Sequence, residues 1–222
     1  MRVNVRTIAG FAWLPMIVAC AAQADAPAAG AAATVAEAAK VLDLTTFPLM
    51  DKADEPSQRN VAALTYNVAA SVSSAYEFQQ QQLGDAWREV SPAYVSSESA
   101  SGVFARSGFT VTVMVFPTGM PGQVRVAIAN LGNVPLDKLP LPDEAKPFFA
   151  GPANAMFLSD APVESTKQTC QKLLLAQGWQ PYGTAGDSLF FKQNAVRLLA
   201  TISAAPAQGG KTMLTYSTEL MS

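Results

Sequence analysis

The 222-residue sequence contains no histidine, and this absence removes several classes of catalytic site. Ser-His-Asp and Cys-His arrangements, histidine-ligated zinc sites and the commonest general base all require an imidazole. The sequence also has no Gly-rich phosphate loop, no CxxC pair and no acidic calcium loop. We therefore expect a protein that is not an enzyme and that has no metal site and no cofactor.

Cysteine and clustered positive charge are also scarce. The two cysteines are Cys20, which lies in the leader, and Cys170. Cys170 falls on the apolar stripe of a predicted helix and aligns with Phe78, so we interpret it as a core residue rather than a nucleophile. Lysine and arginine form no cluster, which argues against nucleic acid and against an anionic lipid surface as partners.

The N-terminus is typical of an export signal, which we place at residues 1–24. Arg2 and Arg6 supply the positive charge, and residues 8–19 form an uncharged, mostly apolar run. That run has about a dozen residues, whereas a membrane-spanning helix needs about 20. Residues 22–24 (Ala-Gln-Ala) fit the small-x-small pattern of ordinary signal peptidase. The sequence therefore predicts export.

A second cleavage point competes with this one. Residues 17–20 (Ile-Val-Ala-Cys) resemble a lipobox, the bacterial lipoprotein signal whose cysteine becomes the lipidated N-terminus. The resemblance implies lipidation at Cys20, and more than one acyl chain would hold the protein on a membrane. Ala21 in place of an aspartate then favours the outer membrane. The alternatives are simple secretion or release into the periplasm, and a retained anchor. Residues 25–41, rich in alanine, are predicted to be a flexible tether with room for a short helix at 34–41.

The remainder contains a repeat. Residues 47–53 (FPLMDKA) are matched 92 positions later by residues 139–145 (LPLPDEA). The same step relates Ala63 to Ala155, Leu83 to Leu175 and Trp87 to Trp179. We therefore predict two tandem copies of one domain, at residues 42–133 and 134–222.

Each copy has the pattern of an α+β unit with the order β-α-β-β-β. The predicted helices cover residues 71–86 and 162–177, with Ser74 and Glu77 at capping-box spacing and Asp160 as a candidate cap. The strands are predicted from alternation of apolar and polar residues. They cover 63–68, 102–105, 109–116 and 123–129 in the first copy, and 155–158, 189–192, 196–203 and 211–218 in the second. Each copy should form a four-stranded, mostly antiparallel sheet with one helix packed on it.

The sheet face away from each helix is not fully polar. It carries Met114, Phe116, Ala127, Ala129, Leu199 and Met213. Either the two sheets pack together through these faces, or the faces bind a partner. Packing together is the usual solution for a tandem duplication.

Three matched or paired sets are candidate sites. Trp87 and Trp179 are candidates for stacking a ligand, or for closing the helix end over the sheet. Asp51 and Asp143 follow Pro-Leu-x in extended segments, where turn or cap hydrogen bonding is the better interpretation. Ser188 and Lys192 form a Ser-Lys pair that nothing else in the sequence singles out.

Together these features predict an exported, lipid-anchored cell-envelope protein that acts as a binding or scaffolding module, with an envelope protein as its partner. A first alternative is a carrier of a small apolar ligand, held between helix and sheet near Phe78, Trp87 and Val111. A second alternative is a hydrolase based on carboxylates or serine. It requires two acidic groups, or a serine and a lysine, to converge in a cleft.

Overall fold

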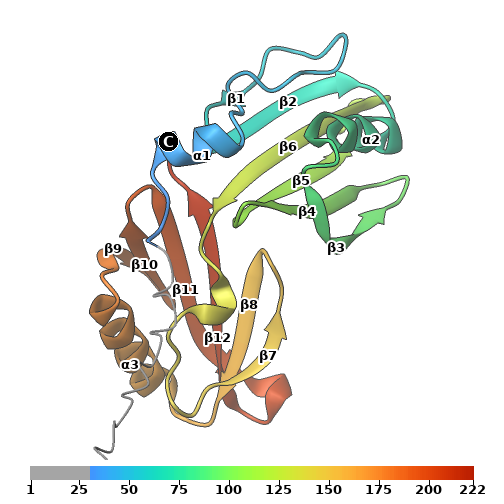
Figure 1. Cartoon of the computed structure of the whole chain (residues 1–222). Coiled ribbons are helices and arrows are strands. Elements are labelled where there is room, and N and C mark those ends of the chain that lie inside the picture. Colours follow the sequence, from blue (N-terminus) through green and yellow to red (C-terminus); the bar gives the residue numbers. More distant parts are fainter. Residues whose placement is uncertain (1–30) are drawn as a thin grey trace, which may run out of the picture.

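The computed structural model describes residues 31–222, which form two sheets with a helix against each (Figure 1). The first sheet follows a short helix, α1 (Val35–Val41). Its elements are β1 (Gln58–Arg59), β2 (Ala63–Ala69), α2 (Val72–Leu83), β3 (Arg88–Val95), β4 (Ala100–Arg106), β5 (Phe109–Pro117) and β6 (Gln123–Gly132). The strands are antiparallel and lie in the order β1-β2-β6-β5-β4-β3.

The second sheet has the same strand order. After a 3-10 turn, η1 (Leu136–Lys138), its elements are β7 (Lys146–Ala150), β8 (Asn154–Ser159), α3 (Val163–Ala176), β9 (Gln180–Ala185), β10 (Ser188–Gln193), β11 (Val196–Ala205), η2 (Pro206–Gln208) and β12 (Lys211–Leu220). The strands are again antiparallel and lie in the order β7-β8-β12-β11-β10-β9. The protein is therefore α+β, as the sequence predicts.

Each sheet has six strands rather than the expected four. The eight predicted strands are the central ones, and the four that the sequence did not reveal are the edges, β1, β3, β7 and β9. The residues of β7 and β9 are exposed throughout, so these strands show no alternation of apolar and polar residues. Pro147 and Pro181 also lower their strand propensity.

The constant step of 92 is wrong across the first central strand and the helix. Leu64 lies opposite Ile128 and Ala155 lies opposite Tyr216, so strand pairing matches Leu64, not Ala63, with Ala155. Burial agrees for the helices, since Leu83 is 7% exposed while Leu175 is 42% exposed. The step between matching residues is therefore 91 from the first central strand to the end of the helix. The second copy has one residue fewer before that strand and one residue more after the helix, which restores the step of 92. Exposed loops absorb such single-residue changes.

The helix starts also differ from the predicted caps. Ser71, not Ser74, caps α2, and its hydroxyl accepts a hydrogen bond from the backbone N–H of Ser74 (3.1 Å). Helix α3 begins after Pro162 with no side-chain cap, and Asp160 instead pairs with Lys211 (2.9 Å). Proline suits the start of a helix, because it has no backbone N–H that would be left without a hydrogen-bond partner there.

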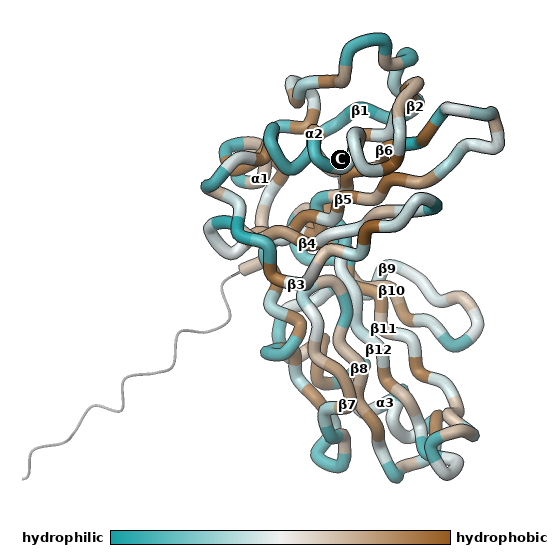
Figure 2. The backbone as a smooth tube through the Cα atoms, turned by 90° about the vertical axis from the view of Figure 1, so that its right-hand side faces the viewer, coloured by the Kyte–Doolittle hydropathy of each residue, from teal (hydrophilic) through white to brown (hydrophobic). Residues whose placement is uncertain are grey.

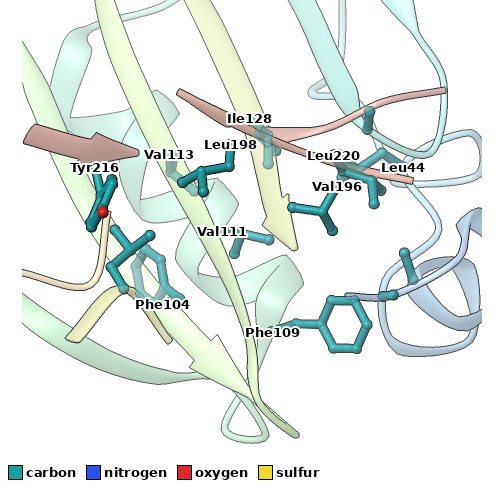
Figure 3. Packing of buried hydrophobic residues seen from close by; sticks show 14 of the residues in the cluster. Leu44, Phe104, Phe109, Val111, Val113, Ile128, Val196, Leu198, Tyr216 and Leu220 are labelled. Carbon is teal, nitrogen blue, oxygen red and sulfur yellow. The ribbon is translucent and has the colours of Figure 1, made fainter. Parts of the chain in front are cut away.

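The two helix-covered faces meet in a single apolar cluster. Figure 3 shows side chains from both halves in this cluster, among them Val111 and Ile128 from the first and Val196 and Leu198 from the second. Strand β6 lies against β12 at the junction of the two halves, and Gly132 lies beside Val196. Hydrophobic residues concentrate in the strands and hydrophilic ones in the connecting loops (Figure 2).

The faces away from the helices do not pack on each other. Met114 and Phe116, on the first of these faces, are 42% and 38% exposed. The expectation that the two sheets bury these faces against each other is therefore wrong. The sheets meet instead through the ends of their strands, so the apolar core under α2 is continuous with the apolar core under α3. Helices α2 and α3 lie at opposite ends of the molecule, at the upper right and lower left of Figure 1.

Part of the predicted tether is packed against the body. Residues 31–34, which we call the strap, lie across the junction of the two halves, with Ala32 and Ala33 buried. Ala33 N–H donates to Asn133 Oδ1 (2.8 Å), and Ala33 carbonyl accepts from Ala195 N–H (3.0 Å). Asn194 Nδ2 donates to the Ala32 carbonyl (2.6 Å). Small side chains permit this close approach of backbones, so the flexible-tether prediction does not hold for this stretch.

Helix α1 follows the strap directly. Thr34 caps it, and the Thr34 and Glu37 side chains form the reciprocal hydrogen bonds of a capping box. The Glu37 pKa is lowered, first by the Thr34 backbone N–H and then by its hydroxyl. The short helix expected at residues 34–41 is therefore present.

Candidate functional site

The two matched tryptophans lie inside the core. Trp87 and Trp179 are 6% and 4% exposed and belong to the apolar cluster. The backbone N–H of each bonds a carbonyl at the end of the preceding helix, Gly84 for Trp87 and Leu174 for Trp179. A ligand cannot stack on rings that are covered on this scale. These residues close the helix end over the sheet.

Cys170 is also a core residue. Its side chain is fully buried, and Sγ lies 3.2 Å from the hydroxyl of Tyr216. Burial raises the pKa of the Cys170 thiol to about 11, so the thiolate that a nucleophile needs is scarce at neutral pH. By helix register it corresponds to Gln79, not to Phe78. Cys20 and the rest of residues 1–30, including the predicted cleavage positions, lie outside the described residues.

The other candidate pairs are not assembled into catalytic sites. Ser188 Oγ lies 3.1 Å from Thr201 Oγ1, while Lys192 Nζ lies over the ring of Tyr182, 5.6 Å from its centroid. Asp51 and Asp143 are exposed. Within residues 31–222 no three His, Cys, Asp or Glu side chains gather closely enough to hold a metal ion. In the same range, no helix has the length and apolar character needed to cross a membrane.

A hollow of about 500 Å³ lies at the start of α2, a size typical of small-molecule sites. Its walls come from the start of α2, the β3–β4 turn and the β5–β6 loop, with Val72, Met120 and Val124 as the apolar part. Ser71, Ser73, Ser97 and Gln123 supply the polar part, and no charged side chain lines it. The hollow therefore offers no titratable group for chemistry.

The four sheet edges are poorly suited to pairing with another strand. Strand β1 has two residues, and β3, β7 and β9 each contain a register shift. Each of these three strands also contains a proline, at positions 92, 147 and 181. Short, bulged and proline-containing edges are how proteins avoid edge-to-edge association. Recognition by strand addition is therefore disfavoured.

The face of the second sheet opposite α3, which we call the open face, carries exposed aromatic side chains at both of its edges. Strand pairing places Phe149, Met156, Thr215 and Thr201 in one row across it, because directly opposite residues share a face. Phe149 on edge strand β7 is 50% exposed, and Tyr182 on the opposite edge strand β9 is 54% exposed. Figure 2 shows the six strands from this side, with α3 behind them.

Positively charged side chains lie over two aromatic rings of the open face, those of Phe190 and Tyr182. Arg197 Cζ lies 5.7 Å from the centroid of the Phe190 ring, and Arg197 is also paired with Glu219. Lys192 lies over Tyr182 in the same way. Each contact is worth about 0.5–1 kcal/mol at an exposed site. The contacts orient the rings while leaving part of their surface in solvent.

Sequence patterns revealed the centre of the open face but not its edges. Leu199 and Met213 were expected on an apolar second face. Phe149 and Tyr182 were missed because their strands show no alternation, and only their aromatic character in a Pro-containing segment could have drawn attention to them.

A scan against models of known protein families, a search of curated proteins and a search of solved structures found no match to this chain.

Proposed function

We propose that this chain is an exported, lipid-anchored and non-enzymatic protein of the cell envelope that binds its partner through the open face of its second sheet. The observation that carries this proposal is the exposure of Phe149 and Tyr182 at the two edges of that face. Soluble proteins bury most large apolar side chains, and a face that carries several of them exposed marks a binding surface.

We further propose that the chain arose by tandem duplication of one α+β unit. The support is the shared strand order, with β1 to β6 matching β7 to β12, and the matching helix between the second and third strands. The buried helix positions also correspond, with Ala75, Gln79 and Leu83 matching Thr166, Cys170 and Leu174.

Neither alternative function gains support from a specific contact. The carrier would need a cavity between helix and sheet, but Trp87 and Val111 are both buried members of the apolar cluster. The hydrolase would need Ser188 and Lys192 to meet, and each has another partner. The carboxylates Asp51 and Asp143 are both exposed.

The location is tested by mass spectrometry of the mature N-terminus. An acylated Cys20 supports the lipoprotein, and a Cys20→Ser variant should then be released from the membrane fraction. A free N-terminus at Asp25 refutes lipidation and leaves simple secretion.

Binding is tested by co-sedimentation of the released Cys20→Ser protein with washed envelope fragments. The double variant Phe149→Ser/Tyr182→Ser should lose most of the retention. The control, Met114→Ser/Phe116→Ser on the first sheet, should keep it. Equal retention of all three proteins would refute binding through the open face.

A further inference from the structure

The open face combines aromatic rings, hydroxyl groups and one ion pair in adjacent rows. Phe190, Leu199 and Ser217 lie opposite one another on three neighbouring strands. The next row toward the ends of the strands contains Lys192, Arg197 and Glu219, again directly opposite one another. An apolar row therefore runs beside a charged row.

A small hollow lies between these two rows. Phe190, Arg197, Leu199, Ser217, Thr218 and Glu219 line it, and its volume is about 60 Å³. A water molecule occupies about 30 Å³ in the liquid, so the hollow has room for a substituent of one or two heavy atoms. The ion pair places donors and acceptors at its rim, since Arg197 only donates hydrogen bonds and Glu219 only accepts them.

The middle of the open face is rich in hydroxyl groups. Thr201 and Thr215 lie opposite each other, and Ser188 Oγ is bonded to Thr201 Oγ1. The centre of a protein–protein interface is instead apolar and depleted in serine. Nucleic acid requires a basic cluster, whereas here Glu219 offsets Arg197. The ligand that fits is itself rich in hydroxyls and has flat apolar faces.

A pyranose ring has this character, because its axial C–H groups form an apolar face and its rim carries hydroxyls. We infer that the open face binds a carbohydrate chain, with sugar rings on Phe149 and Tyr182 and sugar hydroxyls bonded to Arg197 and Glu219. The inference rests on the proposed function and names the ligand class of the same face.

The width of the face sets the kind of carbohydrate. Neighbouring strands lie about 4.8 Å apart, so the five intervals between β7 and β9 span about 24 Å. Phe149 and Tyr182 mark the two ends of that span. A single sugar covers a fraction of it, so the expected ligand is an oligosaccharide or a polysaccharide strand.

The test uses the whole mature chain carrying Cys20→Ser and three soluble probes: tetramers of N-acetylglucosamine, of β-1,4-linked glucose and of α-1,4-linked glucose. Binding is followed by calorimetry and by the amide shifts of β9, β10 and β11 in NMR spectra. We expect at least one tetramer to bind, and Tyr182→Ala and Arg197→Gln each to weaken it by about tenfold.

Tyr94→Ala is the matched control, since Tyr94 is a similarly exposed tyrosine (60%, against 54% for Tyr182) on edge strand β3 of the first sheet. It should leave binding unchanged. Melting curves check that all variants remain folded. Replacing an exposed tyrosine on an edge strand should change the melting temperature little.

The other outcomes separate the two proposals. If no tetramer binds while retention on envelope fragments still depends on Phe149 and Tyr182, the carbohydrate assignment is overturned and the binding face stands. Binding to lipid vesicles of envelope composition through the same residues also overturns it, in favour of a membrane surface. If neither glycan nor envelope binding depends on the open face, both proposals fail.

Discussion

The two halves have the same strand order, but the tyrosine whose buried hydroxyl contacts the helix lies on a different strand in each half. In the first half, Tyr66 on β2 accepts a hydrogen bond from Gln79 Nε2 on α2 (2.9 Å). In the second half, Tyr216 on β12 contacts Cys170 Sγ on α3 (3.2 Å). Gln79 and Cys170 occupy the same helix position. The tyrosine has therefore moved to a neighbouring strand while its partner on the helix has stayed in place.

The residues that replace each tyrosine are apolar. By strand pairing Phe157 stands where the first half has Tyr66, and Ile128 stands where the second half has Tyr216. Phe157 packs edge-on against Tyr216, with 5.9 Å between ring centroids. In each half one strand tyrosine places a buried hydroxyl against the helix, and the difference teaches that either of two neighbouring strands can supply it.

The halves also differ in how completely their buried polar groups are satisfied. Among the described residues, the buried side-chain atoms without a hydrogen-bond partner are Tyr76 Oη, Gln79 Oε1 and Asn130 Nδ2, all in the first half. Burial, followed by the charge of Glu89, raises the pKa of Tyr76 to about 12. An unpaired buried polar group costs about 1–3 kcal/mol, so we infer that the first half is the less stable one.

The largest expected effect comes from breaking the junction between the halves. Gly132 has φ +84°, and a Cβ there would lie 2.8 Å from Val196 Cγ2. Gly132→Ala therefore combines backbone strain with overpacking, and we expect a loss of about 3 kcal/mol in the free energy of unfolding. Urea denaturation measures it. Adding Val196→Ala should relieve the contact but not the strain, and an unchanged midpoint for Gly132→Ala would refute this packing.

The next effect comes from the helix contact that is special to the first half. A Cβ at Gly102 would overlap the hydroxyl of Tyr76, whereas the second half has Leu189 on the strand and Lys167 on the helix at these positions. The first half thus has a tyrosine over a glycine where the second half has a lysine over a leucine. Gly102→Ala should cost about 2 kcal/mol in urea denaturation.

The double variant with Tyr76→Phe sharpens this comparison. Tyr76→Phe alone should be neutral or slightly stabilising, because the hydroxyl has no partner. Combined with Gly102→Ala it should recover part of the loss. Strictly additive effects would mean that the two side chains do not compete for space.

A smaller effect separates the two buried hydroxyls. Tyr216 donates to the carbonyl of Pro140 (2.9 Å), so Tyr216→Phe leaves that carbonyl unpaired and should cost about 1.5 kcal/mol. Gln79→Leu should change stability little, because it removes the unpaired Oε1, and Tyr66 keeps its hydrogen bond to the Met50 backbone. Thermal unfolding of both variants tests the contrast, which fails if Gln79→Leu is the more damaging change.

The smallest expected effect is at the surface. The exposed pair Asp160–Lys211 exists in the second half, while the matching positions of the first half hold Ala69 and Gln123. The Lys211 hydrogen bond and charge lower the pKa of Asp160, so its contribution is present above the unfolded pKa, about 3.9, and is lost as pH falls through the folded value. Asp160→Asn should slightly lower the melting temperature at pH 7 and make no difference at pH 2. A difference that persists at pH 2 would contradict an ionic origin.

The sequence predicted the parts of the fold that bury one face. Alternation in residues 109–116 and 196–203 placed β5 and β11. The edge strands could not be predicted, because strands exposed on both faces show no pattern. The strap was missed for a related reason, since alanines give no signal that distinguishes a buried segment from a tether.

The candidate site was less predictable than the fold. Trp87 and Trp179 stood out because they match between copies, but a match of large apolar residues reflects shared core packing. The aromatic residues of the open face have no aromatic counterparts in the first half, so a comparison of the two copies did not reveal them. Phe149 corresponds to Gln58, a polar residue on the short strand β1.

The strap has a mechanical consequence. Any pull on the segment before Ala31 is borne first by hydrogen bonds to Asn133, between the halves, and to Gln193 and Asn194, on the β10–β11 turn. The load therefore enters at the junction and is shared by both sheets, instead of peeling one strand from an edge. A protein tethered in this way would be held at its middle, which leaves the open face of the second sheet accessible.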